Sequence, residues 1–363
     1  MVFGCGQYGT SGKISEDHSL GAESMKSALV TGATGFLGRN FVTFLLGKGW
    51  NVVCLVRPKS KQEHLKVEGV KLVQGDFTQA EALREAVSGV DVVFHLAGAT
   101  AADSLNEMLE VNCNFTENLV KACMERTEKP IFVYVSSLAA AGPSTVKRPH
   151  IEEDPCTPVS WYGKSKLAAE TMLRKYADEM NITVIRPPML FGPYDHEVSL
   201  WINAIRKSGI FFIPFLRTFR FSMAHAEDVC QILYLAAEKG ERLPGLENTE
   251  SQNVGTGIYY VSQTEHLTYM EMGRLFGKAL GRKFTFILPV TPIFLWIVCQ
   301  FMNLRRKITG KHSAISLDKF REIMSGSWSC SADKARSQLG FQNAHTLLEQ
   351  CKNTAEELKN RNG

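Results

Sequence analysis

Three glycines at a fixed spacing, directly after a short apolar run, are the feature that most constrains how this chain folds. Residues 29–38 read Leu-Val-Thr-Gly-Ala-Thr-Gly-Phe-Leu-Gly. Between a strand and a helix, such a turn suits a dinucleotide: the first glycine permits the tight turn, the second admits a pyrophosphate, and the third lets the helix pack on the sheet. The helix N-terminus adds unpaired N–H groups and partial positive charge. The pattern predicts a nucleotide site at Gly32, Thr34, Gly35, Phe36, Leu37 and Gly38.

Short β-branched runs alternate with helix-like stretches through the first half of the chain. Strands are predicted at 51–57, 70–73, 90–97 and 131–137, and helices at 39–46 and 106–123. Such alternation implies right-handed βαβ units. We therefore expect an α/β protein with a Rossmann-type, doubly wound parallel sheet and a smaller, discontinuous C-terminal lobe for the substrate. We expect residues 1–25 to form a disordered extension and residues 346–363 a C-terminal helical tail. The sheet domain is expected to comprise residues 26–190 and to be rejoined by about 221–262. The lobe is expected to comprise residues 191–220 and 263–345.

The end of the second predicted strand indicates which dinucleotide is bound. NAD-preferring sites carry Asp or Glu about 20 residues beyond the glycines, where it accepts the ribose hydroxyls, but no acidic residue occurs between Gly38 and Glu63. Arg57 stands there instead, and a guanidinium can pair with a 2′-phosphate that a carboxylate would repel. We therefore predict NADP(H) in preference to NAD(H). The alternative is a solvated surface arginine beside Pro58.

Two further segments follow predicted strands and are expected to lie along the same edge of the sheet. Asp76 either caps the next helix or reaches an adenine amino group, and the two roles are compatible. Phe77 adjoins it. Leu96, Ala97 and Gly98 end the fourth strand, where Gly98 would let the backbone approach the cofactor. We predict that all five residues contact the cofactor.

Two serines and a tyrosine–lysine pair supply the candidate catalytic groups. Ser136 and Ser137 end a predicted strand at the carboxyl edge of the sheet, where ligands of such folds bind. Tyr162 and Lys166 are four residues apart at the start of a predicted helix, so their side chains lie on one face. A neighbouring ammonium stabilises a phenolate and lowers the pKa of the phenol from about 10. Tyr162 is therefore a candidate general acid or base.

Together these residues resemble the extended short-chain dehydrogenase/reductase family, also called the NAD-dependent epimerase/dehydratase family. The resemblance covers residues 26 to about 340 and rests, in order, on TGATGFLG (31–38), GDFT (75–78), HLAG (95–98), Asn112, VSSLAAAG (135–142), YGKSK (162–166), RPPMLFGP (186–193) and HAEDV (225–229). It implies a catalytic triad of Ser137, Tyr162 and Lys166. In that triad Ser137 aligns the substrate oxygen and Lys166 also holds the nicotinamide ribose, with Ser136 as an adjacent alternative to Ser137.

The resemblance assigns roles to two more residues. It implies that Asn112 supports a proton relay through Lys166, although the position of Asn112 among apolar neighbours is equally compatible with a satisfied polar group of the core. It also implies that the segment containing Pro188 turns towards the nicotinamide and the substrate.

Two departures from the family pattern narrow the expected reaction. The acid after the second strand, carried by many members that act on nucleotide sugars, is absent, and Ser137 is followed by Leu138 and Ala139 where the dehydratases carry Asp-Glu. Sugar dehydration is therefore disfavoured. The pattern is closer to the dihydroflavonol-reductase and 3β-hydroxysteroid-dehydrogenase branches. It implies hydride transfer between NADP(H) and a carbonyl or secondary alcohol of an apolar, sterol-, flavonoid- or lipid-like molecule. The alternatives are a nucleotide-sugar epimerase that retains NAD and a non-catalytic regulator that senses NADP.

Composition disfavours several other classes of protein. A net charge of +4 with no long basic run gives no reason to expect a nucleic-acid partner. Nine cysteines without C-x-x-C pairs are expected to be buried thiols in a reducing cytosol, and no metal site is predicted. Residues 1–24 lack the basic-then-apolar pattern of a signal peptide. We expect a cytoplasmic protein with a small-molecule substrate, and homodimer formation is left open.

One apolar segment in the last third of the chain has two interpretations. Residues 286–302 carry no charge, and Arg305, Arg306, Lys307 and Lys311 follow. The segment is shorter than the roughly 20 apolar residues that span a bilayer. It is either a helix buried in the substrate lobe or an interfacial helix with a basic flank, which would make peripheral membrane contact through 286–311.

Overall fold

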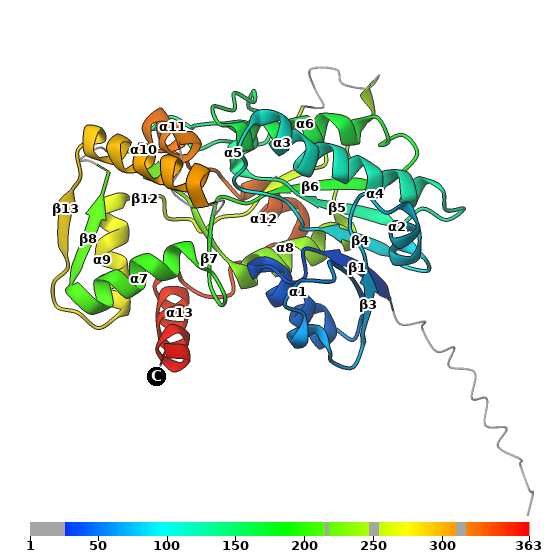
Figure 1. Cartoon of the computed structure of the whole chain (residues 1–363), viewed down its shortest axis with the longest axis horizontal. Helices are drawn as coiled ribbons and strands as arrows, with labels where there is room; N and C mark the ends of the chain where they lie inside the picture. The colour runs from blue at the N-terminus through cyan, green and yellow to red at the C-terminus, as the bar shows by residue number, and fades with distance from the viewer. Residues whose placement is uncertain (1–25, 215–217, 247–253, 310–316, 363) are drawn as a thin grey trace, which may run out of the picture.

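Seven parallel strands form the central sheet of the molecule (Figure 1). The computed structural model describes residues 26–214, 218–246, 254–309 and 317–362. The strands lie in the order β11-β6-β5-β4-β1-β2-β3. Their bounds are β1 Ser27–Thr31, β2 Asn51–Val56, β3 Val70–Gln74, β4 Val92–His95, β5 Ile131–Val135, β6 Ile182–Arg186 and β11 Ile258–Tyr260. The predicted fold class, a Rossmann-type doubly wound parallel sheet, is confirmed.

The strand order reverses at β1, and this reversal fixes where a ligand can bind. The chain continues from β1 to β2 and β3 on one side, then crosses to β4 on the other, so that Thr31 pairs with both Leu55 and His95. Because all neighbours are parallel, every strand of the sheet ends at the same edge. The crevice at such a reversal, outside the carboxyl ends of the strands, is where doubly wound folds bind their ligands.

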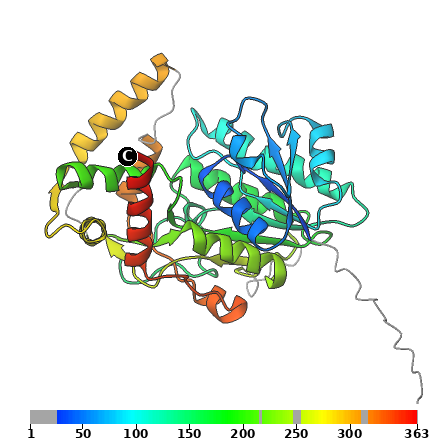
Figure 2. The ribbon, with the colours of Figure 1, turned by 90° about the horizontal axis from the view of Figure 1, so that it is seen from below.

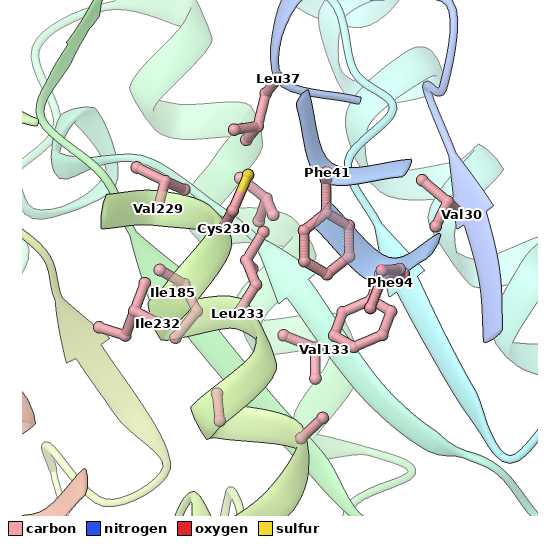
Figure 3. Packing of buried hydrophobic residues seen from close by; sticks show 14 of the residues in the cluster. Val30, Leu37, Phe41, Phe94, Val133, Ile185, Val229, Cys230, Ile232 and Leu233 are labelled. Atoms are coloured by element: carbon pink, nitrogen blue, oxygen red, sulfur yellow. The ribbon is translucent and has the colours of Figure 1, made fainter. Parts of the chain in front are cut away.

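Helices cover both faces of the sheet and bury its apolar side chains. In the first core, Phe41 and Phe94 meet edge-to-face with their ring centroids 4.6 Å apart, and Leu233 packs beside them (Figure 3). Burying one such side chain contributes roughly 1.5–3 kcal/mol to folding. The helices of this face are α1 (Phe36–Gly47), α8 (Ala226–Lys239) and α12 (Asp333–Leu339). Those of the opposite face are α2 (Ala80–Val87), α4 (Phe115–Met124) and α6 (Trp161–Arg174).

The helix predicted over 106–123 is interrupted in the structure. Helix α3 (Leu105–Leu109) leads into a π-helical turn, Glu110–Asn114, before α4 begins at Phe115. The wider turn holds Asn112 buried, facing the site rather than solvent. Single π-helical turns within α-helices are frequent at functional sites.

A separate core, away from the two faces of the sheet, lies among the segments that follow β6. The other elements after β6 are β7 (Met189–Phe191), α7 (Glu197–Ser208), β8 (Ile210–Ile213), β9 (Arg220–Phe221), β10 (Met223–His225), β12 (Leu267–Thr268), α9 (Tyr269–Ala279), β13 (Phe286–Pro289), α10 (Pro292–Thr309), α11 (Leu317–Ser325) and α13 (Leu347–Asn362). Helix α13, predicted as a tail, packs into this core through Cys351 and Ala355. Leu339 and Phe341, which the sequence division assigns to the lobe, pack instead in the first core beside α8.

The apolar segment 286–302 forms β13 and most of α10, and its side chains are largely exposed. Ile293 is 73% exposed and Phe301 is 65% exposed, so the interpretation of this segment as a buried helix is wrong. Within the described part of the chain, no helix combines the length and the apolar character needed to cross a bilayer. The predicted extension 1–25 and Lys311 lie outside the described residues.

Candidate active site

The glycine turn lies directly against the end of β4. Gly32 has φ +73°, and a Cβ there would lie 2.8 Å from the backbone nitrogen of Ala97. A Cβ on Gly38 would collide with the carbonyl oxygen of Gly32 and would lie 2.7 Å from Cα of Ala33. Any side chain at either position would therefore push the turn away from the neighbouring loop or from its own helix. The structure thus brings two predicted cofactor segments, 32–38 and 96–98, into contact.

The first turn of α1 suits an anionic group. Gly35 is the N-cap residue, no side chain caps the helix, and its first turn contains no acidic residue. The first amides of a helix have no intrahelical acceptor, so those of Phe36 and Leu37 are placed to donate to a phosphate. These features fit the pyrophosphate of a dinucleotide.

Arg57 and Asp76 lie at the carboxyl ends of the neighbouring strands β2 and β3. Asp76 accepts hydrogen bonds from the hydroxyl and the amide of Thr78, at 2.6 and 2.8 Å, in the turn before α2. The N-cap of α2 is Gln79 and no side chain caps this helix, so the predicted capping role of Asp76 is wrong. These bonds, and to a smaller degree the charge of Arg57, lower the pKa of Asp76. The Arg57 side chain is exposed. It is therefore accessible to a 2′-phosphate.

A directed chain of hydrogen bonds runs from β1 through β4 to the π-helical turn. Thr116 donates to the backbone carbonyl of Asn112 at 2.9 Å, so its hydroxyl must accept from Nε2 of His95, also at 2.9 Å. Nδ1 of His95 is then the acceptor for Thr31, at 2.7 Å. Burial, and next the charge of Lys166, lower the pKa of His95 to about 3. A neutral His95 therefore connects the end of β1 to the π-helical turn that holds Asn112.

Asn112 joins the loop after β4 to helix α6. Its side-chain oxygen accepts from the amide of Ala99 at 2.8 Å, and its nitrogen donates to the carbonyl of Ala99 and the hydroxyl of Ser165, both at 2.9 Å. A Cβ on Gly98 would lie 3.0 Å from this side-chain oxygen and 3.2 Å from Nζ of Lys166. Asn112 is thus a satisfied buried polar group and also lies beside the predicted catalytic lysine.

Lys166 is buried, and its ammonium group lies beneath the end of β5. Nζ donates to the carbonyl of Val135 at 2.8 Å and lies 4.8 Å from the ring centroid of Tyr134. Burial lowers the pKa of Lys166 to about 8, against an opposing contribution from Glu170. Lys166 therefore carries a readily lost proton at the edge of the sheet, next to Gly98.

Of the two neighbouring serines, only Ser137 is associated with Tyr162. The phenol of Tyr162 is hydrogen-bonded to the Ser137 side chain. Ser136 is buried and donates instead to Glu170, whose carboxylate accepts from Nε of Arg186 at 3.0 Å. This buried network occupies Ser136, so Ser137 is the serine whose hydroxyl group remains beside Tyr162.

The pKa of Tyr162 differs from the sequence-based expectation. Burial raises it to about 12, and the hydrogen bond from Ser137 only partly opposes this shift. The sequence predicts that Lys166 lowers this pKa, but the Lys166 ammonium faces the carbonyl of Val135 and the ring of Tyr134. Burial therefore dominates the shift, and Tyr162 keeps its proton at neutral pH.

Helix α11 contributes contacts that sequence reasoning did not find. Asp318 accepts from the amides of Trp161 and Tyr162 at 2.8 and 3.3 Å, and Glu322 accepts from the hydroxyl of Ser160 at 2.7 Å. These carboxylates lie at the N-terminus of α6, where negative charge is stabilised by the helix dipole. No local pattern links Asp318 to Tyr162, because they are separated by 156 positions.

A loop beyond β7 closes against the glycine-turn helix. Asn40 on α1 donates to the carbonyl of Pro193 at 2.9 Å, and the guanidinium of Arg39 lies 3.8 Å from the ring centroid of Tyr194. Tyr194 adopts φ +69°, a left-handed conformation that is strained for a residue with a side chain. No local pattern in the sequence predicts this contact. Pro188, a predicted site residue, lies half-buried between β6 and β7.

The arrangement supplies a dinucleotide cradle and hydrogen-bond donors at the same sheet edge. Hydroxyls of Ser137 and Tyr162 can stabilise negative charge that develops on an oxygen atom, and Lys166 can stabilise or relay charge beside them. The site is therefore suited to chemistry at a carbon–oxygen bond.

Comparisons with known proteins agree with this geometry. Residues 28–255 match the model of the "NAD dependent epimerase/dehydratase family". The chain is 27% identical to the sterol-4-alpha-carboxylate 3-dehydrogenase, decarboxylating, of Dictyostelium discoideum, over 88% of this chain and 97% of that protein. It is 29% identical to the ceramide reductase of Caulobacter vibrioides, over 84% and 86%. UDP-glucose 4-epimerase from Thermotoga maritima shares the fold, with TM-score 0.72, 19% identity and coverage of 93% and 100%.

Proposed function

The chain belongs to the NAD dependent epimerase/dehydratase family, and we propose that it is an oxidoreductase that uses NADP(H) to interconvert a carbonyl and a secondary alcohol on an apolar small molecule. The observation that carries this proposal is the pairing of Tyr162 with Ser137, with Lys166 beside Gly98, at the sheet edge that also holds the glycine turn. Two relatives aligned over most of the chain are named for reactions of a sterol and of a ceramide, which supports a lipid-like substrate.

The protein's own groups have distinct tasks in this reaction. Tyr162, protonated at neutral pH, donates its proton to the substrate oxygen during reduction, and Ser137 orients that oxygen by a second hydrogen bond. Lys166 lies four residues further along the same helix and is the nearby positive charge that would stabilise the phenolate that remains, once its ammonium turns from the carbonyl of Val135. When bound, NADP(H) supplies or accepts the hydride. Its pyrophosphate would be held by the turn 32–38 and its adenosine 2′-phosphate by Arg57.

Asn112 acts through position rather than contact with the substrate. It holds the backbone of Ala99 at both its amide and its carbonyl, and it holds Ser165 on α6. It thereby fixes the spacing between the cofactor loop 96–98 and the helix that carries Tyr162 and Lys166.

The test is a substrate comparison on the purified protein. Co-purified ligands are identified by mass spectrometry, and NADPH oxidation is followed with a long-chain 3-keto lipid and a 3-keto sterol, alongside UDP-galactose with NAD. The proposal predicts NADPH consumption with a keto lipid or a keto sterol, at a rate that Tyr162→Phe lowers by roughly 10²-fold or more. Retained NAD together with epimerisation of the UDP-sugar would favour the epimerase alternative. Tight NADPH binding without turnover of any of these compounds would favour a sensing regulator.

A further inference from the structure

An unusual amount of apolar surface lies at the end of the molecule that carries β8 and β13. Phe284, Phe286 and Leu288 are 80%, 68% and 42% exposed, and Phe212 is 61% exposed. The two strands pair in parallel with Leu288 opposite Phe212. Because alternate residues of a strand point to one side, Phe286, Leu288 and Phe212 form one outward face, and Phe284 directly precedes it two residues before β13 begins. The other side of this pair packs inward through Phe211 and Ile287.

Helix α10 follows β13 directly in the chain and exposes further apolar side chains. Ile293, Ile297 and Phe301 follow one another at four-residue intervals and are 73%, 52% and 65% exposed, with Phe294 beside them at 58%. Residues at this spacing lie on one face of a helix. Cys299, on another face, is buried. Figures 1 and 2 both show α10 at the end of the molecule farthest from β3, and Figure 2 shows it extending away from the body.

These exposed residues define what we call the docking face: Phe212, Phe284, Phe286, Leu288, Ile293, Phe294, Trp296, Ile297 and Phe301. Soluble monomers rarely expose contiguous apolar surface of more than a few hundred Å² unless it binds something. Single exposed apolar side chains are common on soluble proteins, whereas a group of large ones on consecutive elements indicates a binding surface.

The charge of the surrounding segment indicates what the docking face meets. From Met272 to Leu317 the sequence contains eight lysines and arginines and no aspartate or glutamate. Arg282 and Lys283, both exposed, directly precede Phe284. An apolar face with a basic margin and no acidic residue matches the interface of an anionic bilayer. A second copy of the chain is a poorer occupant, since face-to-face pairing would bring two basic segments together.

We propose that the docking face binds the protein to an anionic lipid surface, with the apolar side chains at the depth of the headgroup and acyl boundary. The inference goes beyond the proposed reaction and does not depend on it. The placement also brings lipid close to the site. Pro292 and Trp296 of α10 share a groove with Phe320 of α11, and Asp318 of α11 contacts the helix that carries Tyr162.

The experiment measures co-sedimentation of the full chain with two kinds of vesicle, phosphatidylcholine alone and phosphatidylcholine mixed with phosphatidylglycerol. Binding to the anionic vesicles is expected at about 50 mM salt, with weakening at about 500 mM. Ile297→Glu/Phe301→Glu should lower the apparent affinity by at least about tenfold. The matched control, Val67→Glu/Ile151→Glu, adds the same charge at two exposed apolar residues away from the docking face and should bind as the unchanged chain does.

Several outcomes would overturn the proposal. The first is absence of binding to anionic vesicles at low salt, and the second is equal binding by the two double variants. The third is a protein that does not bind vesicles but forms a concentration-dependent dimer, which only Ile297→Glu/Phe301→Glu disrupts. If that variant melts early, Arg282→Gln/Lys283→Gln replaces it, and binding that is unchanged by the loss of both charges counts against the proposal. Turnover of a water-soluble ketone by Ile297→Glu/Phe301→Glu reports the proposed reaction separately.

Discussion

At the scale of single residues, burial sets the protonation of the two groups that would exchange protons with a substrate. It raises the pKa of Tyr162 to about 12 and lowers that of Lys166 to about 8, so that both shifts favour the neutral form. Tyr162 consequently holds its proton throughout the neutral range. Lys166 is the group that begins to lose its charge just above that range.

Removal of the Tyr162 hydroxyl tests its assigned role. Tyr162→Phe should lower turnover by roughly 10²–10⁴-fold, the usual contribution of a positioned acid or base. Affinity for NADPH should barely change, because the turn 32–38 is untouched. Lys166→Ala should impair both turnover and NADPH binding, since Lys166 is assigned to both. Near-normal turnover by Tyr162→Phe, with the chemical step rate-limiting, would disprove the assignment.

Arg57 decides the preferred dinucleotide if it binds the 2′-phosphate. A charge-assisted hydrogen bond contributes roughly 1.5–3 kcal/mol, so NADPH should bind at least several-fold more tightly than NADH, and Arg57→Asp should invert the order. Fluorescence titration measures both affinities. Lys59→Asp makes the same change of charge at an exposed neighbour and should preserve the preference for NADPH. Equal affinities of the unchanged chain for the two dinucleotides would rule out this role of Arg57.

At the scale of elements, α11 positions the helix that carries Tyr162. Asp318→Ala removes the acceptor for the amides of Trp161 and Tyr162, a loss comparable to that of an N-cap, about 0.5–2 kcal/mol. We expect a fall in kcat of about tenfold and a smaller change in NADPH affinity, because the glycine turn and Arg57 are untouched and Lys166 lies a full helical turn beyond the contact. Steady-state kinetics and NADPH titration separate the two effects. Asp333→Ala, on the first turn of α12, is the control, and an equal kcat in both variants would contradict the positioning role.

The elements that could be predicted from the sequence are those with local signals. The glycine turn, β2, β3 and β5 lie close to their predicted bounds, and the family resemblance is confirmed by the match over 28–255. The contact of Asp318 with Tyr162 could not be predicted, because its partners are far apart in sequence. The π-helical turn around Asn112 has no distinctive composition. The apolar segment 286–302 was ambiguous, because periodicity alone does not say which face of a helix finds a partner.

At the scale of the whole molecule, stability depends on histidines that are buried without charge. His95 links the end of β1 to the π-helical turn, and its burial lowers its pKa to about 3. His225 lies against Gly192, and burial lowers its pKa to about 4. Among the described residues, Nε2 of His225 has no hydrogen-bond partner. Both histidines are therefore neutral in the folded protein near neutral pH.

Their effect on stability has a definite sign. With folded pKa values of about 3 and 4 and an unfolded value of about 6.5, the unfolded chain binds more protons between these limits. The free energy of unfolding therefore falls as the pH drops below about 6.5, by about 2 kcal/mol for each histidine at pH 5. Glu152, whose pKa burial raises to about 7, binds a proton in the folded state over the same range and offsets part of this loss.

Because Glu152 opposes the histidines, a difference between variants isolates the contribution of His225. Urea unfolding of the cofactor-free protein at several pH values between 7.5 and 5 gives the free energy of unfolding at each. His225→Gln removes the titrating ring, so the free energy of unfolding of this variant should fall less on acidification than that of the unchanged chain. The difference between the two losses should be about 2 kcal/mol at pH 5. His196→Gln replaces an exposed histidine and should retain the original pH dependence. Parallel curves for His225→Gln and the unchanged chain would mean that His225 takes up its proton equally in the folded and unfolded states.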